Sequence, residues 1–224
     1  MNTVNFLIFF LLSFFSLSSG IYGQNVNKIS LEHPETGGAE VKTYAVIYAD
    51  GLPVSAVWPI GKRLTRDDRT IRHGVSGGNG GNLNLNSRVS LRFIVAPEDV
   101  QLNGTSGGES MTWLQACGDN GSDTEPRETF TNLANTGCAA YNYGGRKWRL
   151  PTQRELQLIW ILRQGIGYAY AGVAGASPLG EYVYWSATET ASAAWAFDFS
   201  SGYPRSFTQL KSSRGTRVRC VSDY

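Results

Sequence analysis

Alternation of apolar and polar residues in the C-terminal third of the chain predicts short β-strands. Trp195, Phe197 and Phe199 alternate with smaller or polar residues, which is the period of two of a strand with one buried face. We therefore predict that these aromatic side chains point into the core. Trp185, at the end of an aromatic run that begins at residue 182, is predicted to be buried as well.

Two further runs complete the predicted C-terminal strands. Residues 206–210 form a return strand after a turn, and residues 217–221 form the last strand. In the last strand Val218 and Cys220 share one face, and both arginines share the other. The sequence therefore predicts one apolar face and one basic face.

A complete helix start precedes these strands. Thr152 is placed to act as the N-cap, and Glu155, three residues later, can reach back to the amide of Thr152. The residues that follow at the spacing of one buried helix face are Leu156, Ile159 and Trp160. Gly165 and Gly167 are predicted to end this helix.

Another helix is predicted over residues 127–141. Pro126 stands at its start, where proline is tolerated, and Gly144-Gly145 follows its end. The apolar residues on one face of this helix are Phe130, Leu133, Ala134, Cys138 and Tyr141. Cys138 is therefore predicted to point inward.

The preceding part of the chain is predicted to be β-rich. Strand-like runs at 43–48 and 54–58 flank Asp50-Gly51, a dipeptide typical of hairpin turns. Residues 88–96 alternate like a half-buried strand. The glycine-rich run 74–87 is interpreted as a flexible loop, because it lacks the lysine and the setting of a phosphate-binding loop.

We divide the chain at the polar break 104–108. Residues 24–105 then form a β-rich N-terminal segment, and residues 106–224 form a second domain. Residues 1–23 are interpreted as a secretory signal peptide, since an apolar run too short to span a bilayer is followed by small residues. An uncleaved anchor is the alternative, because the start of the run lacks Lys and Arg.

Charge is distributed unevenly along the chain. From residue 129 onward ten bases face five acids, a balance of +5, whereas residues 24–128 hold ten bases against thirteen acids, a balance of −3. A basic half can attract anionic partners. Because the protein is expected to be exported, these partners are not expected to be nucleic acids.

The candidate binding residues are bases on the last two predicted strands and the loop between them. They are Arg205, Lys211, Arg214, Arg217 and Arg219. Such a cluster could hold sulfates or carboxylates through bidentate contacts. The alternative is an ordinary solvated surface.

Other chemistry is less well supported by the sequence. The run 119–125 offers Asp119, Asp123 and Glu125 to Ca²⁺, but it lacks the rest of a known loop pattern, so a solvated acidic loop is favoured. No zinc motif is present. Cys117 stands in no recognisable relation to either histidine, so a buried or intermolecular cysteine is favoured over a nucleophile. Three cysteines allow three disulfide pairings.

Five blocks of the C-terminal half resemble the bacterial Lcl-type C-terminal domain family. In order they are Cys138, residues 148–156, residues 184–189, residues 195–199 and residues 218–221. The resemblance covers about residues 110–224. It implies a C-type-lectin-like fold, with two helices, a small twisted antiparallel sheet and a disulfide between Cys138 and Cys220.

The resemblance also implies a class of function. The family is associated with surface adhesins, some of which bind sulfated glycans. The chain lacks the Glu-Pro-Asn, Gln-Pro-Asp and Trp-Asn-Asp motifs of calcium-dependent lectins that share the fold. Formylglycine-generating enzymes share it too, but if Cys138 and Cys220 are paired, only Cys117 remains for their reactive cysteine pair.

We therefore expect an exported, non-catalytic α+β protein of the bacterial surface or of fimbriae. It would lie at the cell surface, on the outer membrane or outside the cell, with no transmembrane segment in the mature chain. Anionic or sulfated glycans or other surface proteins are its expected partners, and no cofactor is expected, with Ca²⁺ as an alternative. The alternatives are a structural fimbrial subunit without glycan binding and an enzyme of the formylglycine-generating kind.

Overall fold

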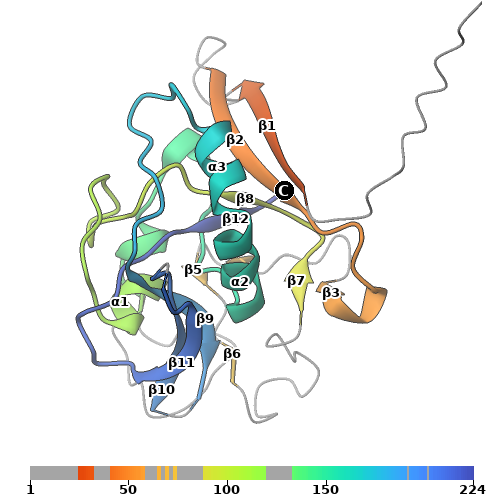
Figure 1. Cartoon of the computed structure of the whole chain (residues 1–224). Helices are drawn as coiled ribbons and strands as arrows, with labels where there is room; N and C mark the ends of the chain where they lie inside the picture. Colours follow the sequence, from red (N-terminus) through yellow and green to blue (C-terminus); the bar gives the residue numbers. More distant parts are fainter. Residues whose placement is uncertain are drawn as a thin grey trace, which may run out of the picture.

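The computed structural model describes residues 25–32, 41–58, 65–66, 69–70, 73–74, 88–119, 133–190, 192–200 and 202–224. Within these residues the chain is a mixed α+β protein with short helices and mainly antiparallel sheets, as predicted (Figure 1). The predicted signal peptide at 1–23 and the glycine-rich run after Gly74 lie outside the described residues.

The first sheet joins strands from both ends of the chain. Its order is β1-β2-β8-β12, and each neighbouring pair is antiparallel. The strands are β1 (Asn25–Glu32), β2 (Val41–Tyr48), β8 (Arg92–Val95) and β12 (Val221–Asp223). The last strand therefore pairs with a strand from the N-terminal part, and the two parts share one sheet.

This sheet lies between two hydrophobic cores. The core that we call the disulfide core contains Tyr44, Val46, Ile94, Trp113, Trp185, Cys117, Cys138 and Cys220. The core that we call the helix core contains Ala45, Ile47, Phe93, Val95, Val221, Leu156, Ile159 and Ile166. Successive residues of β2 and β8 enter opposite cores, because side chains alternate across a strand.

The prediction of a single half-buried strand at 88–96 was wrong in two respects. A bend at Leu91 divides it into β7 (Val89–Ser90) and β8. Phe93, Ile94 and Val95 are all fully buried, because β8 has a core on each side.

The second sheet contains the predicted C-terminal strands. Its order is β11-β10-β9-β6, antiparallel between β9, β10 and β11 and parallel between β6 and β9. The strands are β6 (His73–Gly74), β9 (Val183–Glu189), β10 (Ala193–Asp198) and β11 (Arg205–Leu210). Among the described residues β11 and β6 are the two edge strands of this sheet, and Figure 1 shows β9, β10 and β11 together below α3.

Burial in this sheet follows the prediction for most of the aromatic residues. Trp185 is fully buried, and Phe197 and Phe199 are buried in the helix core. The prediction for Trp195 was wrong, because its side chain is only partly buried while Ala194 and Ala196 enter the disulfide core. The pairing of β9 with β10 shifts register between these two alanines, and the shift breaks the simple alternation at Trp195.

The predicted hairpin across Asp50-Gly51 was wrong. Residues after the turn form a short 3₁₀ helix, η1 (Val54–Ala56), and then β3 (Val57–Trp58), which pairs in parallel with β7. Strand β2 instead pairs with β1 and β8. A small antiparallel pair, β4 (Thr65–Arg66) and β5 (Arg69–Thr70), completes the strands.

The predicted capping box is present at the start of α2 (Gln153–Ile161). The hydroxyl of Thr152 accepts from the amide of Glu155 at 3.2 Å, and the carboxylate of Glu155 accepts from the amide of Thr152 at 2.9 Å. Leu156 and Ile159 are fully buried. Side-chain oxygens thus pair with two backbone amides that the helix itself leaves without a partner.

The predicted end of this helix was wrong. The helix stops at Leu162, and α3 (Arg163–Ala169) follows at once with Gly165 and Gly167 inside it. Ile166 is buried in the helix core, and a side chain at Gly165 would meet Val26 of β1 at 3.3 Å. Tertiary packing thus outweighs the low helix propensity of glycine.

The predicted helix at 127–141 was wrong where it is described. Residues 127–132 lie outside the described residues, and residues 133–141 contain only a 3₁₀ turn, η3 (Gly137–Ala139). Gly137 has a φ of 53°, which interrupts a right-handed helix. A short helix that the sequence did not reveal, α1 (Trp113–Cys117), packs against η3 and starts with a capping box of Thr112 and Gln115.

The disulfide that the resemblance implied is present. Cys138 of η3 and Cys220 are joined, 82 residues apart in sequence, and both are fully buried. Val218 and Cys220 point into the disulfide core as predicted, although the strand β12 starts only at Val221. The bond ties η3 to the segment that leads into the first sheet. A second 3₁₀ turn, η4 (Tyr143–Gly145), follows η3.

Thr152→Ala should lower the free energy of unfolding by about 1 kcal/mol, because the cap oxygen is lost while the fold is kept. Thr152→Ser retains the oxygen and is the matched control. Urea denaturation followed by tryptophan fluorescence measures both variants. Equal midpoints for the alanine variant and the unaltered protein would show that the cap does not stabilise α2.

Candidate ligand-binding surface

The five predicted cations do not form one surface cluster. Lys211 is fully buried at the end of β11, and its ammonium group lies 2.7 Å from the carboxylate of Glu189, which is also fully buried. The ammonium also lies 4.8 Å from the centre of the Trp113 ring. Lys211 is therefore part of the interior.

Arg219 is buried as well. Its Nε donates to Asp99 at 2.8 Å, and its terminal nitrogens donate to the carbonyl oxygens of Ala96, Ser177 and Pro178. A guanidinium group with this many partners fixes the loop around it. Arg219 therefore holds the loop at 177–178 against the end of β8.

Arg217 lies between the interior and the surface. Its side chain is 26% exposed, approaches Asp99 at 3.5 Å and stacks on Tyr182, with 3.4 Å from the guanidinium carbon to the ring centre. Asp99 also accepts from the hydroxyl of Tyr184 at 3.0 Å. Burial, and then the neighbouring Asp99, raise the pKa of Tyr184. The guanidinium group of Arg217 therefore already has an acidic and an aromatic partner within the protein.

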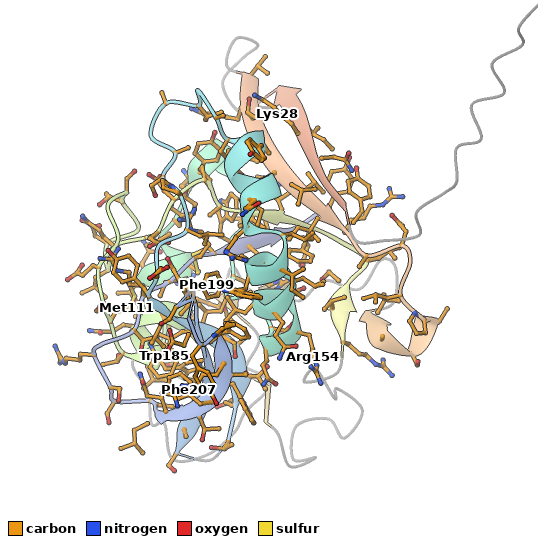
Figure 2. The ribbon with its side chains drawn as sticks, in the orientation of Figure 1. Lys28, Met111, Arg154, Trp185, Phe199 and Phe207 are labelled. Atoms are coloured by element: carbon orange, nitrogen blue, oxygen red, sulfur yellow. A yellow bond between two sulfur atoms is a disulfide. The ribbon has the colours of Figure 1, made fainter. Side chains whose placement is uncertain are left out.

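Arg205 and Arg214 are the exposed members of the five. The guanidinium carbon of Arg205 lies 5.8 Å from the ring centre of Tyr203 and 5.2 Å from that of Phe207. Tyr203 is 71% exposed. We call Tyr203, Arg205 and Phe207 the Arg205 ledge, and Figure 2 shows its labelled member, Phe207, over β11.

The ledge combines a cation with an exposed aromatic ring. Among the described residues no carboxylate forms an ion pair with Arg205. Asp198 lies opposite Arg205 on the neighbouring strand β10. Its carboxylate accepts instead from the amide of Ser200 at 3.0 Å. A guanidinium group held over aromatic rings can donate two parallel hydrogen bonds to a sulfate or carboxylate.

Most of the acidic run, the candidate Ca²⁺ site, lies outside the described residues. Asp119 is fully buried just after α1, while Asp123 and Glu125 lie outside the described residues. No group of three or more His, Cys, Asp or Glu side chains that could hold a metal ion occurs among the residues the structure describes. Cys117 remains a thiol and is buried in the disulfide core.

Sequence reasoning missed Tyr203 and the acids that hold the buried cations. Tyr203 stands before a proline next to the hairpin turn, and an aromatic residue in such an exposed position was the available signal. Glu189 and Asp99 gave no such signal. Asp99 lies 120 residues from Arg219, so only the fold brings them together.

Residues 107–222 match the model of the Lcl C-terminal domain. The chain belongs to this family. No curated protein and no solved structure matches the chain. The Arg205 ledge and the disulfide fall inside the Lcl C-terminal domain, whereas β1, β2 and β8 precede it. In the described residues we find no helix with the length and hydropathy needed to cross a membrane.

Lys211→Met should lower the free energy of unfolding by about 3–5 kcal/mol, because it breaks the buried ion pair with Glu189. Arg205→Ala is the surface control and should change the free energy of unfolding by no more than about 0.5 kcal/mol. Adding Glu189→Leu to Lys211→Met should recover part of the loss, since the buried acidic partner is then removed as well. Guanidinium denaturation provides the values. If Lys211→Met were as mild as Arg205→Ala, Lys211 would not have the interior role described.

Proposed function

We propose that this protein is an exported bacterial surface protein, adhesin-like or fimbria-associated, that binds anionic glycans at the Arg205 ledge. Its Lcl C-terminal domain would have a C-type-lectin-like fold and serve as the binding module. The observation that carries the proposal is the exposed guanidinium group of Arg205 over two aromatic rings.

The chemistry of the ledge suits an acidic sugar. The guanidinium group of Arg205 would donate to a sulfate or carboxylate group, and the exposed ring of Tyr203 offers an apolar face against which a sugar ring can pack. Both groups lie on or next to β11, an edge strand of the described second sheet, where a long polymer would have access.

A single ledge would bind weakly. Its contact with an anion is exposed, so salt screens it over a Debye length of about 8 Å at physiological ionic strength. Several copies of the protein on one surface would bind a repeating polymer more strongly through multivalency. Sulfated polymers, with closely spaced charges, fit this requirement.

Two alternatives belong to other classes of function. A structural surface subunit would bind protein partners and no glycan. An enzyme of the formylglycine-generating kind would need a reactive cysteine pair, whereas Cys138 and Cys220 are bonded to each other and Cys117 is buried. The cysteines therefore favour a binding role over this enzyme class.

Retention on a heparin column across a salt gradient tests the ledge. Arg205→Ala and Tyr203→Ala should both elute at lower salt than the unaltered protein, and Arg205→Lys should fall between because it keeps the charge but loses the bidentate geometry. Arg154→Ala is the matched control. It removes one exposed cation from the first turn of α2, where Figure 2 labels Arg154.

The variants separate a site from general charge. If Arg154→Ala shifts elution as much as Arg205→Ala, retention reflects net charge and the ledge is not a site. If the unaltered protein is not retained at low salt, the structural-subunit alternative is favoured. Unchanged thermal stability of each variant is the check that the fold is intact.

A further inference from the structure

A small cavity lies where α3 ends. Its volume is about 220 Å³, and its walls include Ile166, Gly167, Tyr170, Val173 and Leu179. The walls come from α3 and from the loop 171–179, which Figure 1 shows as the long cyan loop after that helix. The cavity is separate from the Arg205 ledge, which lies on and beside β11.

The residues that line the cavity are uncharged. Residues 164–180 contain no Asp, Glu, Lys, Arg or His, in a chain of which 17% of residues are charged. Arg163 and Glu181 border this run, and most of the loop 171–178 is exposed. An exposed run of this length without charge is characteristic of a contact surface for an uncharged partner.

Gly167 has no packing reason to be glycine. A β-carbon at Gly167 would meet nothing within 4 Å, whereas one at Gly165 in the same helix would meet Val26. Glycine is among the poorest helix-forming residues, so alanine would suit α3 better at this position. Gly167 therefore lines the cavity without a side chain that could narrow it.

The cavity is formed before any ligand arrives. The guanidinium group of Arg219 donates to the carbonyl oxygens of Ser177 at 3.2 Å and Pro178 at 3.3 Å. The amide of Ser177 donates to the carbonyl oxygen of Pro97 at 3.0 Å, and the hydroxyl of Tyr170 donates to that of Val95. These bonds hold the loop on the end of β8, so binding would cost little ordering of the walls.

We propose that this cavity receives one apolar side chain from an uncharged peptide segment of a partner protein. The volume is below the roughly 300 Å³ at which typical small-molecule sites begin, which suits one side chain. The side chains of Ile166, Val173 and Leu179 in the walls suit an aliphatic group.

The test uses ¹⁵N-labelled whole chain and N-acetyl-leucine methylamide as the probe, with methyl β-glucoside as the sugar arm. Saturable shifts of the amides of Ile166, Val173 and Leu179 with the leucine probe at millimolar concentration are expected. Gly167→Leu and Ala171→Leu place a side chain at the wall and should weaken this binding at least about tenfold. Gln164→Leu adds the same side chain to α3 outside the cavity lining and should leave binding unchanged.

Three results would overturn the proposal. They are no saturable shift with the leucine probe, equal binding by all three leucine variants, and binding of the glucoside alone. Arg205→Ala should bind the leucine probe like the unaltered protein, so the outcome is independent of glycan binding at the ledge.

Discussion

The buried ion pair between Arg149 and Glu155 connects elements that lie far apart in the sequence. Both side chains are buried, and their closest nitrogen and oxygen lie 2.7 Å apart. Glu155 also accepts from the amides of Thr152 and Ser90, while Arg149 donates to Asp223 at 3.0 Å. Burial alone would lower the pKa of Arg149, but Asp223 and Glu155 outweigh it and raise that pKa. A buried pair is tolerated only when its remaining hydrogen bonds are satisfied, as they are here.

This pair makes the Lcl C-terminal domain depend on residues that precede it. Ser90 belongs to β7, Glu155 to α2 and Asp223 to β12, so one ion pair connects the N-terminal part, the helix and the last strand. Buried cations elsewhere act in the same way, since Lys211 and Arg219 each bind an internal acid. The basic balance of the C-terminal half is therefore partly internal. Arg205 is left as an exposed cation on β11, at an edge of the second sheet.

Local signals in the sequence predicted the elements that depend on near neighbours. The Thr152 box needs only residues three apart, the strand around Phe197 needs only an alternating pattern, and the strand at Trp185 follows from an aromatic run. Over its described residues 133–141 the predicted helix was wrong, because Gly137 adopts a left-handed conformation, and the predicted helix end at Gly165 was wrong, because Gly165 packs on Val26. The site was harder to predict. Whether Lys211 or Arg205 faces solvent depends on Glu189 and on the sheet order, which no local pattern encodes.

Hydrogen exchange of an Arg149→Met variant tests most directly whether this ion pair unites the two parts of the chain. We predict a large loss of stability and a parallel loss of amide protection in β2 and β8 and in α2 and β9. Arg149 and its partners connect α2 with β7 and β12, β12 pairs with β8, β8 pairs with β2, and α2 packs on β9. Protection lost in α2 and β9 while β2 and β8 keep theirs would contradict this prediction. The two parts would then unfold separately, and the ion pair would not be the link between them.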